Sequence, residues 1–399
     1  MSIPDADSAR RDAAHNGVRV GLAVVGVVVV AATMRAGITC VGPLISVLRA
    51  DTGLSSSQVG ALNTLPLLAF AAVAAVAPRI AREFGLERSL FGAVVVTMIG
   101  TVVRSLPANA ALFGGTALLG CGIGCSNVLL PGLIKRDFPR HIEIMTATYA
   151  TTLGVTAAIS SGVAVPIAGV APGGWRTALG CWALIALAGA LVWLPRLGVT
   201  TRPPRVAGSP GVWRSALAWQ VTAFIGLQSF GFYVVVTWLP TILQTHHYSS
   251  SAAGWELFLY QAVSLVASSA APVMAGRMRD QRWLAGVSGV FGVIGFSGLL
   301  AAPSIAPLWV ICMGLGSGAC FSLALSFFAL RAGTPRQAAA LSGMAQSMGY
   351  LFAAAGPVVL GVLHDVWHSW TTPLVVLIGV ALFQVAAGFA AGRARTVAR

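Results

Sequence analysis

Long apolar stretches dominate this chain, and short polar stretches separate them. Crossing the hydrocarbon core of a bilayer takes about 20 apolar residues per helix, and cutting the chain at its polar stretches leaves segments of that length. Strands are not a competing interpretation, because the runs are too long and lack two-residue alternation. The pattern predicts an all-α membrane protein with twelve transmembrane helices at residues 20-48, 56-78, 88-106, 110-134, 144-170, 176-194, 215-243, 252-275, 284-302, 306-330, 338-363 and 372-392.

Composition and charge support a membrane protein and exclude most other classes. Hydrophobic residues make up 57% of the 399 residues and charged residues only 9%, whereas soluble domains are about a quarter charged. The formal net charge of +14 does not indicate a nucleic-acid partner, because the basic residues are scattered between the apolar runs. The polar start of the chain, residues 1-19, lacks a clean signal cleavage site, and we interpret it as a tail.

The basic residues predict the orientation in the membrane. Nearly all of the 25 arginine and lysine residues fall in the two ends of the chain and in the connections on one side of the predicted membrane. The other side holds only Arg49, Arg104 and Arg176, at helix ends. Positively charged connections stay in the cytoplasm. We therefore expect a multi-pass protein of the cell inner (plasma) membrane, with both termini cytoplasmic and a second tail at residues 393-399.

An internal repeat divides the chain at its longest polar connection. VGPLI resembles WLPTI, and LIKRDFPRH resembles FALRAGTPRQ. The matching prolines lie 197, 194 and 196 positions apart and are Pro43 with Pro240, Pro78 with Pro272 and Pro139 with Pro335. We expect two pseudo-symmetric six-helix bundles, residues 20-194 and 215-392, joined by a cytoplasmic linker at residues 195-214. This arrangement, with a substrate cavity between the bundles near the midplane, describes the major facilitator fold.

Arg35 is the most unusual residue, because it lies near the middle of the first predicted helix. Insertion there costs an arginine about 2.5 to 3.5 kcal/mol, so the side chain should face a cavity or a partner. None of the eleven acidic residues lies at a helix centre. Arg35 therefore has either a structural role, bonded to carbonyls, hydroxyls, amides or water, or an anionic ligand. We favour the ligand, because a guanidinium suits planar oxygen or nitrogen acceptors.

Other polar and aromatic side chains share this depth in the membrane. Alone, each is typical of a hydrogen bond between helices, but their gathering in the second half favours a polar cavity. The predicted substrate-binding residues are Arg35, Asn127, Gln228, Tyr233, Trp238, Tyr260, Gln261, Gln346 and Tyr350. Glu256, near the outer start of its helix, is the acid nearest this depth. It is a candidate for proton coupling, and the alternative interpretation is a harmless residue of the outer rim.

The sequence lacks the patterns of an enzyme or of an ATP-driven pump. It contains no Walker A motif, nucleophile elbow or HExxH, and its glycine-rich GCGIGC and GLGSG lie inside apolar segments, where small residues let helices pack closely. The six cysteines also fall inside apolar runs, where they are typical of packing and not of metal ligands or disulfides. We expect no cofactor and no metal, and we interpret the chain as a monomeric secondary transporter.

Several strings resemble one transporter family over nearly the whole chain. MRAGITCVGPLISVLRADTGLSSSQVGALNTLPLL, NVLLPGLIKRDFP, QSFGFYVVVTWLPTIL and QSMGYLFAAAGP look like the cyanate/2-nitroimidazole transporter family of the major facilitator superfamily. The resemblance implies alternating access and small polar or anionic solutes. It places family motif residues on Arg35, Asn127, Pro131, Gln228, Ser229, Tyr233, Gln346, Ser347 and Tyr350. Met34 before Arg35 and the acid at Glu256 depart from the family pattern.

Three functions compete on this evidence. The leading hypothesis is a secondary active transporter that moves a small anionic solute, cyanate-like or another small organic anion, by alternating access. Symport with protons is one option for its coupling. The alternative is proton-driven efflux of nitroimidazole-like or other drugs, which predicts a more apolar cavity with an acid in it. A transporter-like sensor would carry a signalling domain, which the short tails do not supply.

Overall fold

The computed structural model describes residues 6–198, 201 and 210–397, which form helices joined by short connections. The α-helices are α1 (Ala6–Thr39), α2 (Val41–Thr52), α3 (Ser56–Phe84), α4 (Leu86–Val103), α5 (Asn109–Asp137), α6 (Ile142–Val170), α7 (Trp175–Gly180), α8 (Ala183–Trp193), α9 (Ala216–Thr245), α10 (Ser250–Gly276), α11 (Arg282–Ala301), α12 (Ala306–Leu330), α13 (Pro335–Trp367) and α14 (Thr371–Ala391). Short 3-10 helices are η1 (Leu194–Arg196), η2 (Pro210–Arg214) and η3 (Pro303–Ile305). Parts of the predicted tails and linker, residues 1–5, 199–200, 202–209 and 398–399, lie outside the described residues.

The twelve predicted membrane crossings are confirmed. Within the described residues, twelve helical stretches are long and apolar enough to span a bilayer, and each matches one predicted segment. The structure adds two breaks that the hydropathy pattern does not show. The first crossing is interrupted at Cys40, three residues before Pro43, and the sixth is interrupted between Gly180 and Ala183. Pro43 lacks an N–H and its ring crowds the carbonyl four residues earlier, which weakens the helix near the first break.

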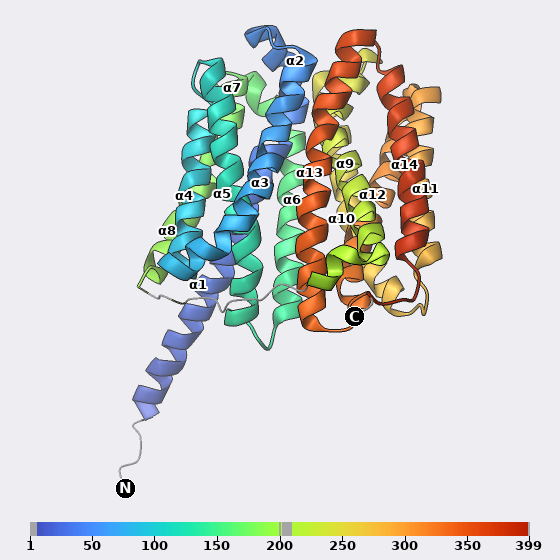
Figure 1. The fold of residues 1–399 in the computed structure, drawn as a ribbon. Coiled ribbons are helices and arrows are strands. Elements are labelled where there is room, and N and C mark those ends of the chain that lie inside the picture. The colour runs from blue at the N-terminus through green and yellow to red at the C-terminus, as the bar shows by residue number, and fades with distance from the viewer. Residues whose placement is uncertain (1–5, 199–200, 202–209, 398–399) are drawn as a thin grey trace.

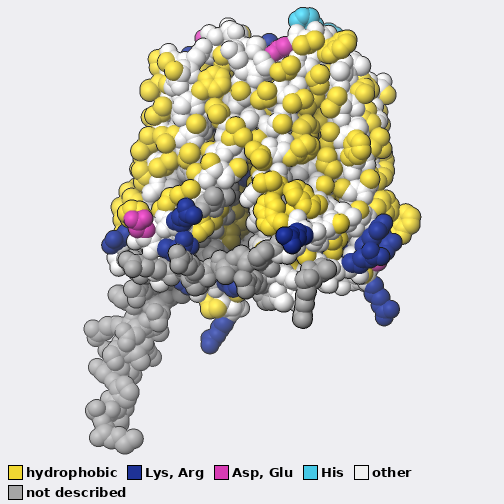
Figure 2. All heavy atoms as spheres, viewed as in Figure 1, with side chains coloured by type: hydrophobic (Ala, Val, Ile, Leu, Met, Phe, Trp, Pro, Cys, Tyr) yellow, Lys and Arg dark blue, Asp and Glu magenta, His cyan; other side chains and the backbone are white. Residues whose placement is uncertain are grey.

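The crossings form two six-helix bundles that stand side by side (Figure 1). We call α1 to α8 the N-half and α9 to α14 the C-half. The start of α1 and the chain after α14 lie at the same end of the molecule, which we call the terminal face, and α2 and α7 reach the opposite end, the distal face. Hydrophobic side chains cover the flank in Figure 2, and lysine and arginine gather at the terminal face. This distribution is typical of a protein held in a bilayer.

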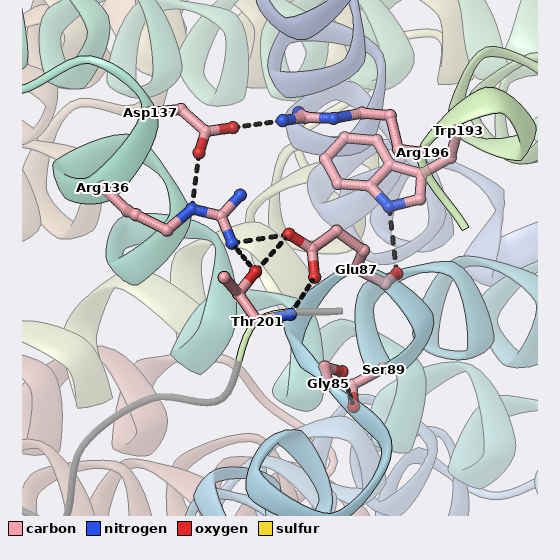
Figure 3. A network of polar contacts seen from close by, with 8 residues as sticks. All are labelled: Gly85, Glu87, Ser89, Arg136, Asp137, Trp193, Arg196 and Thr201. Carbon is pink, nitrogen blue, oxygen red and sulfur yellow. Dashed lines mark hydrogen bonds and ion pairs between the residues drawn. The ribbon is translucent and has the colours of Figure 1, made fainter. Parts of the chain in front are cut away.

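A charged cluster holds the N-half together at the terminal face (Figure 3). Arg136 at the end of α5 bonds Glu87 of α4 at 2.5 Å and Asp137 at 2.6 Å, and Arg196 also pairs with Asp137. Thr201 donates its hydroxyl to Glu87 at 2.5 Å and its backbone N–H to the same carboxylate at 3.2 Å. The chain that follows the sixth crossing is therefore tied back to the start of the third.

A related cluster, with an amide in place of the carboxylate, occupies the equivalent place in the C-half. Arg331, just after α12, donates to the side chain of Gln281 at 2.5 Å and to the carbonyls of Ala391 and Gly392 at 2.9 Å. The Val397 N–H donates to the Arg331 carbonyl at 2.8 Å. The positions repeat along the chain: Glu87 with Gln281, Arg136 with Arg331 and Thr201 with Val397, spaced 194, 195 and 196 residues apart. The two bundles thus share contacts as well as topology, including the segment that follows each sixth crossing.

The two halves meet closely on the distal side. Asp365 near the end of α13 accepts hydrogen bonds from the backbone N–H groups of Ser56 at 3.1 Å and Ser57 at 2.8 Å, where α3 begins. Gly42 and Gly60 lie against C-half backbone, and a Cβ on either would collide with the carbonyl oxygen of Val236 or Pro357. The hydrogen bonds between the halves, within the described residues, all involve this side or the level of the cavity below it.

Candidate functional site

A cavity of about 120 Å³ lies between the halves at mid-depth. Arg35 of α1 and part of α6 line it from the N-half, and α9, α10, α12 and α13 line it from the C-half. Its α6 lining runs from Ala150 to Ala157 and its α10 lining from Gln261 to Ser268. These residues lie on the terminal side of the distal contacts. The cavity therefore extends from the closed distal side toward the terminal face.

Arg35 lies one turn before the end of α1 and faces this cavity. Its guanidinium carbon lies 5.4 Å from the centre of the Phe232 ring, which is within range of a cation–π interaction. At ordinary hydrogen-bond geometry, Arg35 donates to no side chain or carbonyl among the described residues, and none of the ion pairs between them includes it. The Tyr233 hydroxyl lies close enough for a looser contact with the guanidinium. An arginine has five N–H donors, so donors remain for a molecule in the cavity.

Tyrosines surround Arg35. Tyr233 and Tyr350 line the cavity with it, and Tyr149 of α6 is the third tyrosine close enough to interact with the guanidinium. The Tyr149 hydroxyl lies 3.4 Å from the Asn127 side-chain oxygen, which attaches the predicted Asn127 to the edge of this group. The chain has only five tyrosines, and membrane proteins usually place tyrosine at the bilayer surfaces. The gathering of three of them, Tyr149, Tyr233 and Tyr350, around Arg35 at mid-depth indicates a polar site with aromatic walls.

Two glutamines of the C-half face the same space. Gln228 donates to the carbonyl and the hydroxyl of Ser317, both at 3.3 Å, and Gln261 donates to the Ser161 hydroxyl of the N-half at 3.4 Å. The Tyr260 hydroxyl donates to the same Ser317 hydroxyl at 2.8 Å, but it does so in a small neighbouring pocket inside the C-half. The side-chain amides of Gln228 and Gln261 thus line the cavity and also form hydrogen bonds with serines of neighbouring helices.

Besides Tyr260, four predicted site residues lie away from the cavity lining. The Trp238 side chain is fully buried in the distal contacts, where its indole donates to the Pro357 carbonyl at 2.9 Å. Gln346 donates to the Ser342 hydroxyl at 2.7 Å, and Asn127 reaches the site only through Tyr149. Glu256 lies one helical turn from Tyr260 toward the distal face, and one of its carboxylate oxygens is buried without a partner among the described residues.

Sequence reasoning missed several residues that shape the site. Tyr149 lies only seven residues after the start of α6, where a tyrosine is typical of the membrane surface. Ser229, Ser264 and Phe321 line the cavity, yet similar residues occur throughout the apolar runs. Arg104 lies at a helix end, as predicted, but it is buried at 1% exposure. In each case the missing information is the rotation of one helix against its neighbours.

The comparisons with known proteins settle the family. A match to the Major Facilitator Superfamily covers residues 27–357, which is most of the chain. This chain belongs to the Major Facilitator Superfamily. Within the superfamily, it is 43% identical over 378 residues to the transporter YycB of Bacillus subtilis, with 94% of each chain covered. It is also 42% identical over 381 residues to the 2-nitroimidazole transporter of Escherichia coli, covering 94% of this chain and 96% of that one.

A more distant relative and a solved structure agree with this placement. The cyanate transport protein CynX of Escherichia coli is 28% identical over 353 residues, covering 85% of this chain and 89% of the relative. The resemblance to the cyanate and 2-nitroimidazole transporters is thereby confirmed. The nucleoside transporter NupG superposes with a TM-score of 0.76 at 12% identity, over 92% of this chain and 99% of that one, which confirms the fold alone. The major facilitator protein described here is a membrane transporter and not an enzyme.

Proposed function

We propose that this transporter carries a small organic or inorganic anion and that Arg35 is the cation that binds it. The observation that supports the proposal is a guanidinium open to a cavity at mid-depth, with no carboxylate among its described neighbours. A buried charge is costly in a membrane unless it is paired. An anion in the cavity would supply both the opposite charge and the hydrogen-bond acceptors that Arg35 lacks.

The aromatic wall favours a flat anion with delocalised charge. Phe232 presents its ring to Arg35, and the rings of Phe232 and Tyr233 lie edge to face at 5.2 Å. Ring faces stack on flat conjugated groups, while tyrosine hydroxyls donate to oxygen or nitrogen acceptors. The relatives named for cyanate and for 2-nitroimidazole fit this description, because both compounds are small and planar or linear with nitrogen acceptors.

The closed distal side suggests how the solute moves. In the proposal, the anion enters the cavity from the terminal face, and the halves rock about it so that the distal contacts open as the terminal side closes. The basic residues at the terminal face support a cytoplasmic position for that face in the inner membrane. Glu256, with its unpartnered buried oxygen, is the candidate for coupling to protons.

Uptake into proteoliposomes tests the proposal. We would measure transport of cyanate, benzoate and 2-nitroimidazole by the wild type, Arg35→Lys and Arg35→Gln, with Arg176→Gln as the control for loss of an arginine outside the cavity. Removing charge-assisted hydrogen bonds costs about 1.5 to 3 kcal/mol, so Arg35→Gln should weaken anion uptake at least about tenfold, with Arg35→Lys between it and the wild type. Equal uptake by wild type and Arg35→Gln contradicts the proposal.

Proton coupling is tested separately with an imposed pH gradient. If Glu256 carries the proton, wild-type uptake should follow the gradient and Glu256→Gln should transport without responding to it. If wild-type uptake does not respond to the pH gradient, proton coupling is excluded, and the proposal that Arg35 binds the anion is unaffected.

A second candidate function is export of neutral nitroimidazole-like compounds, which the 42% identity to the 2-nitroimidazole transporter favours. It differs from the first in its dependence on charge. Export of an uncharged compound should survive Arg35→Gln, whereas transport of its anion should not, and measuring 2-nitroimidazole flux at acidic and alkaline pH separates the two.

A further inference from the structure

Arg104, the residue that follows α4, is a buried arginine that the proposed transport mechanism leaves unexplained. Only 1% of its surface is exposed. Its two terminal nitrogens donate to the Gly37 carbonyl at 2.5 Å, to the Leu179 carbonyl at 3.2 Å and to the Cys40 sulfur at 3.7 Å. No ion pair among the described residues includes it. The charge is therefore met by backbone and sulfur alone.

The carbonyls that Arg104 binds come from two helix ends. Gly37 lies in the last turn of α1, and Leu179 lies in the last turn of α7. Carbonyls in the last turn of a helix have no partner within that helix, and they carry partial negative charge. Arg104 thus bonds to both breaks in the N-half at once, and these helix ends explain how it can stay buried without a carboxylate.

The same turn of α1 carries Arg35. Gly37 is two residues beyond Arg35, and Thr39 donates its hydroxyl to the Arg35 carbonyl at 3.0 Å. The Thr39 hydroxyl also lies 2.6 Å from the Ser160 hydroxyl of α6. The last turn of α1 is therefore held by Arg104 from α4 and by Ser160 from α6. Without these contacts, a turn next to a helix break would be free to fray.

We propose that Arg104 is a positioning residue for the cavity: it fixes the last turn of α1 at the break and so holds the Arg35 guanidinium toward the solute. The inference rests on the proposed role of Arg35. An arginine suits this task because its planar fork reaches two acceptors in different directions, whereas a lysine offers one point charge on a flexible stem. Arg104→Lys should therefore reach one helix end and rescue the function in part.

Arg331 provides a matched control in the C-half. It is also buried, at 3% exposure, and it also donates to carbonyls at a helix end, those of Ala391 and Gly392 after α14. It lies at the terminal face, away from the cavity. Arg331→Gln should therefore lower thermal stability as Arg104→Gln does, while only the second substitution disturbs the solute site.

The experiment compares wild type, Arg104→Gln, Arg104→Lys and Arg331→Gln in lipid nanodiscs, with benzoate as the probe. We expect Arg104→Gln to raise the dissociation constant about tenfold, Arg104→Lys to raise it less, and Arg331→Gln to leave it unchanged. Hydrogen exchange of the peptide at residues 30–45 gives a second measurement that needs no ligand. It should accelerate in Arg104→Gln and not in Arg331→Gln.

Two results would overturn the inference: wild-type affinity and wild-type exchange in Arg104→Gln, or equal effects of Arg104→Gln and Arg331→Gln on both measurements. Failure of the wild type to bind benzoate, cyanate or 2-nitroimidazole would count against the proposed function instead. In that case the exchange of residues 30–45 still decides whether Arg104 fixes the turn.

Discussion

Replacing Asp365 should open the distal side of the transporter. Its carboxylate bridges the halves by accepting from the first backbone N–H groups of α3, Ser56 at 3.1 Å and Ser57 at 2.8 Å. A carboxylate at a helix N-terminus is stabilised by the helix dipole as well as by these bonds. In Asp365→Asn, the side chain keeps one acceptor oxygen but turns an amide donor toward a second N–H. The closed distal state therefore loses one hydrogen bond to a carboxylate and the favourable interaction of the negative charge with the N-terminus of α3.

The structure sets the size of the effect. A hydrogen bond to a charged group contributes about 1.5 to 3 kcal/mol, and a charge at a helix N-terminus about 0.3 to 1 kcal/mol. The Asp365 side chain is 29% exposed, so water screens part of this interaction. We expect the closed distal state to lose about 1 to 2 kcal/mol relative to the open one. That loss changes the ratio of closed to open molecules about 5- to 30-fold.

Spin labels across the distal face measure this ratio. Labels at Thr52 in the N-half and Ser369 in the C-half, in a background where the six cysteines are replaced, report the separation of the halves. Asp365→Asn should add a population at longer distance. Asp51→Asn is the control, because Asp51 is also a distal acid but bonds Trp175 and Arg176 within the N-half. A distance distribution in Asp365→Asn that matches the wild type, or an equal shift in Asp51→Asn, would refute the reasoning.

Three further substitutions test other contacts. Gly42→Ala places a methyl group against the Val236 carbonyl, so the same spin labels should report distal opening and uptake should slow; wild-type distances would contradict the packing. Phe232→Leu removes the ring beside Arg35 and should weaken benzoate binding by about 0.5 to 2 kcal/mol in a titration, whereas Phe230→Leu should not. Glu87→Gln removes one anion from the N-half cluster and puts there the amide that the C-half has at Gln281. A thermal melt should show a loss of about 1 to 2 kcal/mol with uptake retained.

The number and order of the membrane crossings were predictable from sequence, but the breaks within them were not. Hydropathy depends on composition over about 20 residues, so it locates a span without resolving its interior. Proline does not supply the missing signal, because Pro66 and Pro240 lie inside continuous helices while Pro43 follows a break. At the break, Arg104 binds the Gly37 carbonyl and the Cys40 sulfur, and it lies 64 residues from Cys40 in the sequence.

The candidate site was predictable in its cation and only partly in its walls. Arg35 stands out because a charge at mid-span has few explanations. An aromatic residue or an amide at the same depth has many explanations, and a small rotation of its helix decides whether it faces a cavity, another helix or lipid. Tyr233 and Trp238 are five positions apart on α9, yet one lines the cavity and the other is buried against α13. The helix period places the two side chains about 140° apart. It does not say which of the two directions faces the cavity, because the N-half partner is absent from the local pattern.

Among the described residues, Arg35, Arg104 and Arg331 lie within the protein, and their surroundings differ in a way that supports the proposed role of Arg35. Arg104 and Arg331 are almost fully buried, and backbone carbonyls at helix ends accept their hydrogen bonds. Arg35 has no such carbonyl, and its described neighbours are rings and hydroxyls around a cavity. A helix end is a permanent partner, whereas a cavity admits a partner that comes and goes. In the proposed function, the charge of Arg35 is therefore the one that an anionic solute completes during transport.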